Sequence, residues 1–197
     1  MPEFHQSKRR ILIPMPVYER LNGLAGLTQE SNGVLLYTPE KKPNGSYDCH
    51  VHGLFMTAVG NAGHVQAAPD KVTVVNKFLE NNPKYKFVKW HTHSAGTGRE
   101  LGEQWWSQFS AQDIAGYEDQ MREEPGFIGM VVSPTHILIH GQGTATRHEP
   151  VLTTVHIIAA SPDHNQNDAF IAREIERAHR ETKIPMIRLK ASRKSTQ

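Results

Sequence analysis

One stretch of the sequence decides both the fold and the site, and it reads YKFVKWHTH over residues 85–93. Its apolar and aromatic residues predict a strand that ends in two histidines, His91 and His93. Because a strand directs residues i and i+2 to the same face, both imidazoles can reach one metal ion. A hydrolytic zinc site needs three protein ligands, an open position for water and a nearby base. Glu30 upstream and Asp113 downstream could complete that set.

Strands and helices alternate along the rest of the chain. The patterns predict strands at 33–38, 50–59, 85–93, 127–132, 136–140 and 151–159, and helices at 16–26, 70–80, 110–123 and 167–181. The strands at 127–132 and 136–140 are expected to form a hairpin. Residues 94–109 fit neither pattern, because Gly96, Gly98 and Gly102 disfavour helix and strand. The interleaving predicts an α/β (α+β) protein with a mixed sheet.

Composition and charge exclude several classes of protein. A length of 197 residues fits one domain, and a formal charge of +2 without a basic stripe argues against nucleic-acid binding. Cys49 is the only cysteine, so no internal disulfide can form, and a reducing compartment is expected. No apolar run approaches the roughly 20 residues that span a bilayer, so no membrane association is expected. With no targeting segment recognised, we expect a cytoplasmic protein.

Each candidate site residue has an ordinary explanation when taken alone. Ser110 followed three positions later by Asp113 is close to a capping box. A His-x-His is not rare among 12 histidines, and His50 and His52 form a second one, which we interpret as strand residues. Glu30 could be a solvated loop carboxylate. The site hypothesis therefore depends on the joint pattern.

Taken together, the pattern resembles that of the JAMM (MPN-plus, JAB-domain) zinc metallopeptidases. In that family a Glu precedes a Gly-Val-Leu strand, a His-Ser/Thr-His ends a later strand, and a Ser-x-x-Asp opens a helix. The corresponding residues here are Glu30 before 33–35, the HTH of 91–93 and the SAQD of 110–113. The resemblance covers about residues 11–140. It implies a mainly antiparallel, curved sheet flanked by helices, in the cytidine-deaminase-like MPN fold.

The resemblance also implies the role of each residue. His91, His93 and Asp113 would bind Zn2+, Glu30 would act as general base, and Ser110 would donate a hydrogen bond to the developing oxyanion. The implied substrate is ubiquitin or a ubiquitin-like protein, cut after its C-terminus. Other components of a ubiquitin-like conjugation pathway are then possible partners.

The segment 94–109 departs from the family pattern. Ser94 replaces the usual proline, and 16 residues separate the second histidine from the Ser-x-x-Asp, where the family has a shorter interval. Glu100 or Glu103 could in principle replace Asp113 as third ligand, but neither follows a serine at this spacing. We keep Asp113.

The same segment is expected to form a flap beside the cleft. Trp105 and Trp106 would either contact a substrate or only pack against the domain. We divide the chain into a metallopeptidase domain at 1–160, a helical extension at 161–189 and a basic tail at 190–197. Two other functions remain open, a non-catalytic MPN scaffold and another His-x-His metalloenzyme such as a cupin-type oxygenase.

Overall fold

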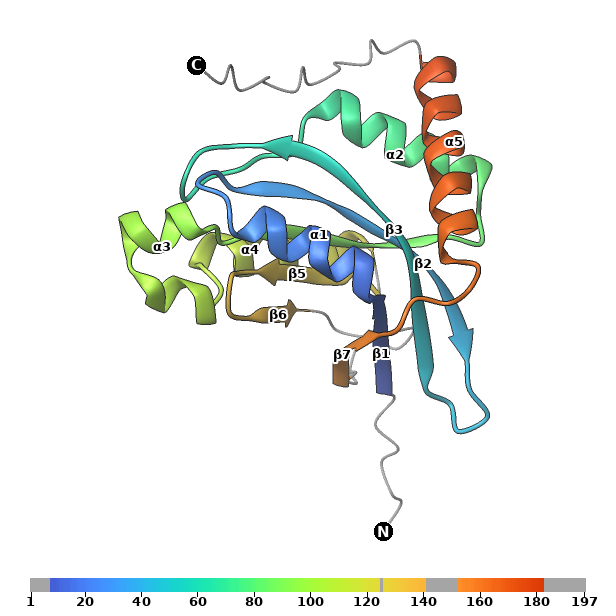
Figure 1. Cartoon of the computed structure of the whole chain (residues 1–197), viewed down its shortest axis with the longest axis horizontal. Coiled ribbons are helices and arrows are strands. Elements are labelled where there is room, and N and C mark those ends of the chain that lie inside the picture. The colour runs from blue at the N-terminus through green and yellow to red at the C-terminus, as the bar shows by residue number, and fades with distance from the viewer. Residues whose placement is uncertain (1–7, 125, 141–151, 183–197) are drawn as a thin grey trace, which may run out of the picture.

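The computed structural model describes residues 8–124, 126–140 and 152–182 (Figure 1). In this part of the chain, the strands are β1 (Lys8–Pro14), β2 (Ser31–Lys41), β3 (Tyr47–Val59), β4 (Lys86–Thr92), β5 (Gly129–Val132), β6 (Ile137–His140) and β7 (Leu152–Ile158). The helices are α1 (Met15–Ala25), α2 (Pro69–Asn81), α3 (Ala95–Leu101), α4 (Ala111–Glu123), α5 (His164–Thr182) and the short 3-10 helix η1 (Glu103–Ser107).

The strands form one mixed sheet in the order β6-β5-β4-β2-β3-β1-β7. The pairs β2–β3, β2–β4 and β5–β6 are antiparallel, whereas β1–β3, β1–β7 and β4–β5 are parallel. The prediction of a mixed α/β protein is confirmed, but the expectation of a mainly antiparallel sheet is wrong. Parallel neighbours are joined through long crossover connections, and the sequence pattern does not reveal which distant strands become neighbours. The edge strands β6 and β7 also contact each other, so the sheet curves toward a barrel.

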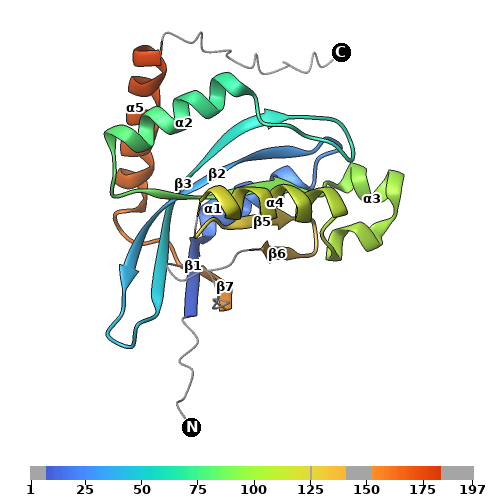
Figure 2. The same ribbon diagram turned by 180° about the vertical axis from the view of Figure 1, so that it is seen from behind.

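Successive residues of β2 are buried alternately on the two faces of the sheet. Leu35 and Tyr37 pack in one core with α1, while Val34 and Leu36 pack in a second core with α2 and α5. This is the period of two expected for a strand covered on both faces. Figures 1 and 2, viewed from opposite sides, show α1 on one face of the sheet and α4 on the other.

Most of segment 94–109 is helical, in α3 and η1, so the prediction of irregular structure there is wrong. Ser94 caps α3 by accepting a hydrogen bond from the backbone N–H of Thr97. A Cβ on Gly96 would lie 1.8 Å from the carbonyl oxygen of Thr28, and one on Gly98 would lie 2.3 Å from the Trp106 ring. These glycines therefore allow close packing, and the packing outweighs their low helix propensity.

The remaining predicted elements are confirmed to within a few residues at their ends. The hairpin at 127–140 is β5 and β6, and the last helix begins at His164, three residues before its predicted start at 167. Residue 151 of the last predicted strand, positions 183–189 of the extension and the tail 190–197 lie outside the described residues. Cys49 is buried, as expected for a small apolar side chain. Among the described helices, none is long and apolar enough to cross a membrane.

Candidate metal centre

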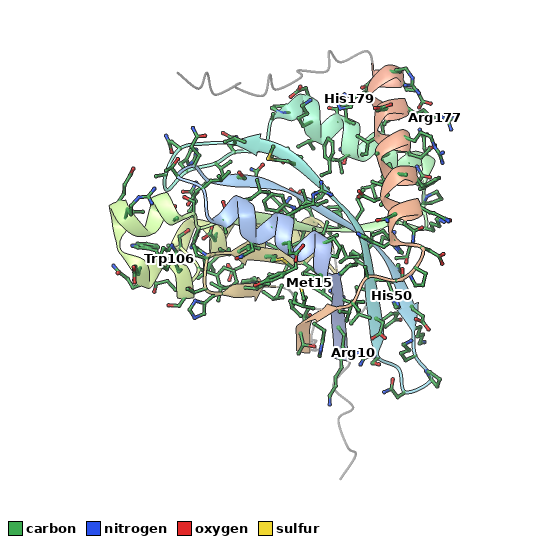
Figure 3. All side chains as sticks on the ribbon, in the orientation of Figure 1. Arg10, Met15, His50, Trp106, Arg177 and His179 are labelled. Carbon is green, nitrogen blue, oxygen red and sulfur yellow. The ribbon has the colours of Figure 1, made fainter. Side chains whose placement is uncertain are left out.

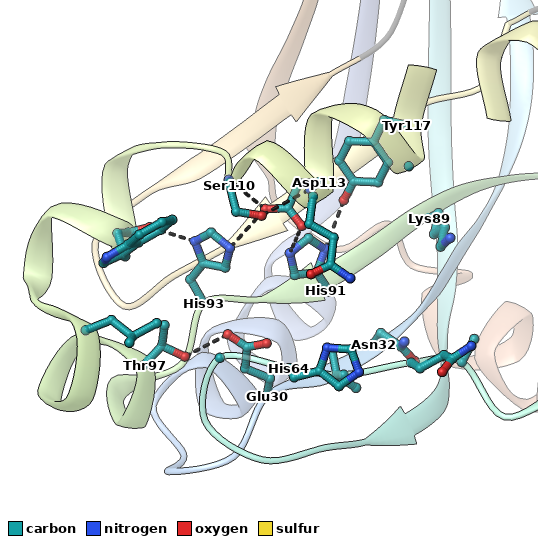
Figure 4. Close-up of a pocket in the computed structure, with 18 residues that line it drawn as sticks. Glu30, Asn32, His64, Lys89, His91, His93, Thr97, Ser110, Asp113 and Tyr117 are labelled. Atoms are coloured by element: carbon teal, nitrogen blue, oxygen red, sulfur yellow. Dashed lines mark hydrogen bonds and ion pairs between the residues drawn. The ribbon is translucent and has the colours of Figure 1, made fainter. Parts of the chain in front are cut away.

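The sheet and one helix bring His91, His93 and Asp113 into a single cluster (Figure 4). His91 lies in β4, which is paired on both sides, and the backbone N–H of His93 continues that pairing to Val132. His91 Nε2 lies 3.1 Å from Asp113 Oδ1, and His93 Nε2 lies 3.2 Å from Asp113 Oδ2. Potential ligand atoms of the three residues all lie within 4.8 Å of one another. Two imidazole nitrogens and a carboxylate are a donor set that suits zinc.

A capping box at the start of α4 holds the carboxylate of Asp113. Ser110 Oγ accepts from the Asp113 backbone N–H at 3.0 Å, and Asp113 Oδ2 accepts from the Ser110 backbone N–H at 2.8 Å. The capping explanation is thus confirmed, and the cap also orients Asp113 toward the histidines. Because Ser110 Oγ acts here as an acceptor, the cap does not use the hydroxyl proton of Ser110.

The outer ring nitrogens of the histidines determine where their protons lie. His93 Nδ1 lies 2.6 Å from the backbone carbonyl oxygen of Trp105, which can only accept. His91 Nδ1 lies 3.0 Å from the hydroxyl of Tyr117, and that hydroxyl donates to the carbonyl of Met130 at 3.2 Å. Both Nδ1 atoms therefore carry a proton, and in the neutral tautomers both Nε2 lone pairs point at carboxylate oxygens.

Lone pairs that face a carboxylate at about 3 Å need a positive charge between them. That charge is either a proton on an imidazole or a metal ion at the cluster. Burial alone would lower the pKa of His93, but Asp113 and the Trp105 carbonyl raise it above its ordinary value. Burial likewise opposes ionisation of Asp113, yet the histidines hold its pKa far below the usual range. The donor set and its outer hydrogen bonds therefore fit a bound cation.

Glu30 lies in the same cavity, on the far side of the imidazoles from Asp113 (Figure 4). Only 4% of its surface is exposed, so it is not a solvated loop carboxylate. Burial is the main cause that raises the pKa of Glu30, against a hydrogen bond from Thr97 and the charge of the histidines. A carboxylate with a raised pKa suits an acid–base role near neutral pH.

The cavity has a volume of about 350 Å³, and all five predicted site residues line it. The other residues that line it are Asn32, Gly63, His64, Val65, Gln66, Ala67, Lys89, Thr97, Leu101, Trp105, Gln112, Gly116 and Tyr117. Sequence reasoning did not select most of these residues, among them Lys89, Tyr117 and Thr97. Lys89 precedes His91 by two residues on the same strand face, and Tyr117 follows Asp113 by one helical turn, so their spacing could have indicated them. Thr97 had no such signal.

Segment 94–109 borders the cavity, as predicted, through Thr97, Leu101 and Trp105. Trp106 has a different role, because its indole N–H donates to the carbonyl of Ser94 at 3.1 Å and its ring packs on Gly98 (Figure 3). Trp106 therefore packs against the domain, whereas Trp105 lines the cavity, where a substrate could contact it. Whether the segment acts as a flap stays a prediction.

The rival candidates lie outside this cavity. Glu100 and Glu103 are exposed and do not line it. His50 bonds to Glu40 at 2.9 Å and lies away from Trp106 and the α3 end of the molecule (Figure 3). His52 bonds to Thr38 at 2.7 Å and does not line the cavity. His50 also lies near Glu40 and Asp48, but those carboxylates already form ion pairs with Lys42 and Arg10.

Comparison with known proteins adds little to this geometry. No protein-family model matches the sequence, and no curated protein is significantly similar to it. The solution structure of protein DSY2949 from Desulfitobacterium hafniense is similar at 14% sequence identity, with a TM-score of 0.43, over 76% of this chain and 94% of that chain. A likeness at this TM-score carries no argument about fold or function.

Proposed function

We propose that this protein is a zinc-dependent peptidase or isopeptidase of the JAMM type, with a cytidine-deaminase-like MPN fold. One observation carries the proposal. Both Nδ1 atoms of His91 and His93 are engaged as donors, so both Nε2 lone pairs converge on the Asp113 carboxylate. A buried carboxylate, Glu30, lines the same cavity. This combination is what hydrolysis of an amide at a metal centre requires.

His91, His93 and Asp113 are the residues that would hold the ion. When bound, zinc would lower the pKa of a water molecule and polarise the scissile carbonyl. The carbonyl of Trp105 and the hydroxyl of Tyr117 orient the two imidazoles. The protein thus supplies both the ligands and the hydrogen bonds that fix their direction.

Glu30 accepts the proton of the attacking water and later gives a proton to the leaving amine. Burial raises the pKa of Glu30 toward neutral pH. The protonated form is therefore favoured after the first transfer and can supply the proton for the second. Ser110 donates its hydroxyl proton to the carbonyl oxygen as negative charge develops there. That proton is free for the task, since the helix cap uses Ser110 Oγ only as an acceptor.

The proposed substrate is ubiquitin or a ubiquitin-like protein, cut at the amide after its C-terminus. This part of the proposal rests on the sequence resemblance, which covers the residues that meet in the cavity. The C-terminal tail of the modifier would bind in this site in an extended, strand-like conformation. Enzymes that attach such modifiers are the corresponding partners.

Metal analysis and cleavage assays together test the proposal. The untreated protein should contain about one zinc per chain, and His93→Ala should lose it, because two protein ligands hold zinc poorly. Glu30→Gln should keep the zinc and lower cleavage of ubiquitin-like fusions by about 10²- to 10⁴-fold, the usual contribution of a general base. Glu103→Gln is the matched control, since Glu103 is exposed and outside the cavity.

Two outcomes contradict the proposal. Stoichiometric zinc in His93→Ala would remove the metal centre from this cluster. Bound zinc without chelator-sensitive cleavage of any fusion would contradict the hydrolase and leave a metal-binding scaffold.

A further inference from the structure

The segment between the histidines and α4 sends one side chain to the proposed base. Thr97, in the first turn of α3, is 2% exposed, and its Oγ1 donates to Glu30 Oε1 at 2.7 Å. The two residues are 67 positions apart in the chain. A short bond from a hydroxyl to a carboxylate in a buried place is of the strong, charge-assisted kind. The contact therefore constrains Glu30 more than a surface bond would.

Among the described residues, two acceptors lie within reach of the Thr97 hydroxyl proton, and the nearer is Glu30 Oε1 at 2.7 Å. Ser94 Oγ donates its own proton to the carbonyl of Thr28 at 3.1 Å, so it could only accept from Thr97, and it lies farther away, at 3.2 Å from Thr97 Oγ1. Ser94 Oγ also accepts from the Thr97 backbone N–H at 3.2 Å. The Gly96 N–H donates to the carbonyl of Leu27 at 3.2 Å, so the start of α3 is docked on the chain just before Glu30. The position of the Thr97 hydroxyl is thus set by several bonds.

This bond engages one oxygen of Glu30 and leaves the other available. Oε1 is held by Thr97, and within the described chain no hydrogen bond to Oε2 is found. We propose that Thr97 is a positioning residue that fixes the rotamer of Glu30 and leaves Oε2 as the oxygen that takes the proton from water. The inference rests on the proposed function, because it assigns a task to Glu30 within that reaction. It gives the segment 94–109, the largest departure from the family pattern, a part in the chemistry.

A purely structural role for Thr97 makes different predictions. In that role the side chain only fills the space between α3 and Glu30, and a valine of the same shape would serve equally well. In the positioning role the hydroxyl is essential, so Thr97→Ser should restore what Thr97→Val loses. Thr182→Val is the matched control, because among the described residues the Thr182 hydroxyl bonds only to backbone carbonyls of α5.

The kinetic test measures kcat, KM and their pH dependence on the cleaved fusion, with zinc content measured in parallel. Thr97→Val should lower kcat by roughly tenfold or more with little change in KM, because misplacement of a catalytic group acts on the transition state. The acid limb of kcat/KM should move up by about one pH unit, since loss of a hydrogen bond to the charged carboxylate favours its protonated form. Zinc content should not change in either variant. Full activity in Thr97→Val, or no rescue in Thr97→Ser, overturns the proposal.

A second measurement separates this proposal from the proposed function. Carbon NMR of the Glu30 carboxyl follows its protonation without any substrate. The pKa of Glu30 should be higher in Thr97→Val than in the wild type and in Thr97→Ser. If the wild type cleaves no fusion, the proposed function fails, and this titration alone decides whether Thr97 holds Glu30. Identical titrations in all three proteins overturn the positioning role.

Discussion

Removal of one buried hydroxyl, in Tyr117→Phe, tests whether the histidine cluster is built to hold a metal. The Tyr117 hydroxyl accepts from His91 Nδ1 and donates to the Met130 carbonyl. Its ring packs edge-on against Phe109 and tilted against Phe127, and a phenylalanine keeps those contacts. The substitution therefore leaves the shape of the core and removes the group that fixes the orientation of His91.

The size of the effect follows from these two bonds. Loss of an outer hydrogen-bond partner of a metal ligand lowers metal affinity by about 10- to 100-fold, which is about 1.4 to 2.8 kcal/mol. The change also leaves the Met130 carbonyl and the His91 N–H without their buried partner, which costs about 1–3 kcal/mol of folding free energy. We therefore expect a clear loss in zinc affinity together with a lower Tm of the zinc-free protein.

Competition between the protein and a chromogenic chelator gives the zinc affinity of each variant. Tyr18→Phe is the control, because Tyr18 lies on α1 and does not line the cavity. The Tyr18 variant should bind zinc as the wild type does. Equal zinc affinity in the wild type and in folded Tyr117→Phe would refute the reasoning, because His91 would then need no partner for its Nδ1 proton.

Three further substitutions test other parts of the structure. Ser110→Ala should lower turnover by about 10²- to 10³-fold in steady-state kinetics, because the oxyanion donor is lost. Chemical denaturation should show a loss of about 1 kcal/mol in folding free energy, because the helix cap is lost. Normal turnover per folded molecule would mean that Ser110 acts only as a cap. Gly98→Ala should lower the Tm but not the zinc content, because the new Cβ would lie 2.3 Å from the Trp106 ring. Arg10 lowers the pKa of Asp48 in the folded protein. The ion pair therefore stabilises the fold fully at a pH above the pKa that Asp48 has in the unfolded chain. This stabilisation is lost as the pH falls through the lower pKa that Asp48 has in the folded protein. Asp48→Asn should therefore lower the Tm near pH 7, and the Tm difference from the wild type should become smaller in acid. A Tm difference that stays constant across the pH range would contradict a stabilising ion pair.

Local patterns were enough to predict most elements, and the joint order of Glu30, the two histidines and the Ser-x-x-Asp was needed to predict the ligand cluster. The alternation in β4 placed two histidines on one strand end, and the serine cap placed Asp113 at the start of α4. These signals are local, because strand periodicity and capping depend on residues only a few positions apart. The structure accordingly brings together the residues that the sequence pattern selected.

Contacts between distant segments were not predictable from the same patterns. The parallel placement of β1 beside β3 and β7 depends on crossovers, and the glycines of α3 indicated irregular structure because their packing partners lie elsewhere in the chain. The carbonyl of Trp105, which holds His93, belongs to the backbone and has no signature in the sequence. Thr97 reached Glu30 through the same unpredicted helix.

The bond between His93 and the main chain at residue 105 separates the two tasks of its segment. Because a backbone carbonyl orients the imidazole, any residue at position 105 can keep that bond, while the side chains of Leu101 and Trp105 face the cavity. Those two side chains can therefore diverge, in evolution or by engineering, toward new substrates without disturbing the histidine. The length of the segment has no such freedom, since a deletion would shift both this carbonyl and the helix that carries Thr97.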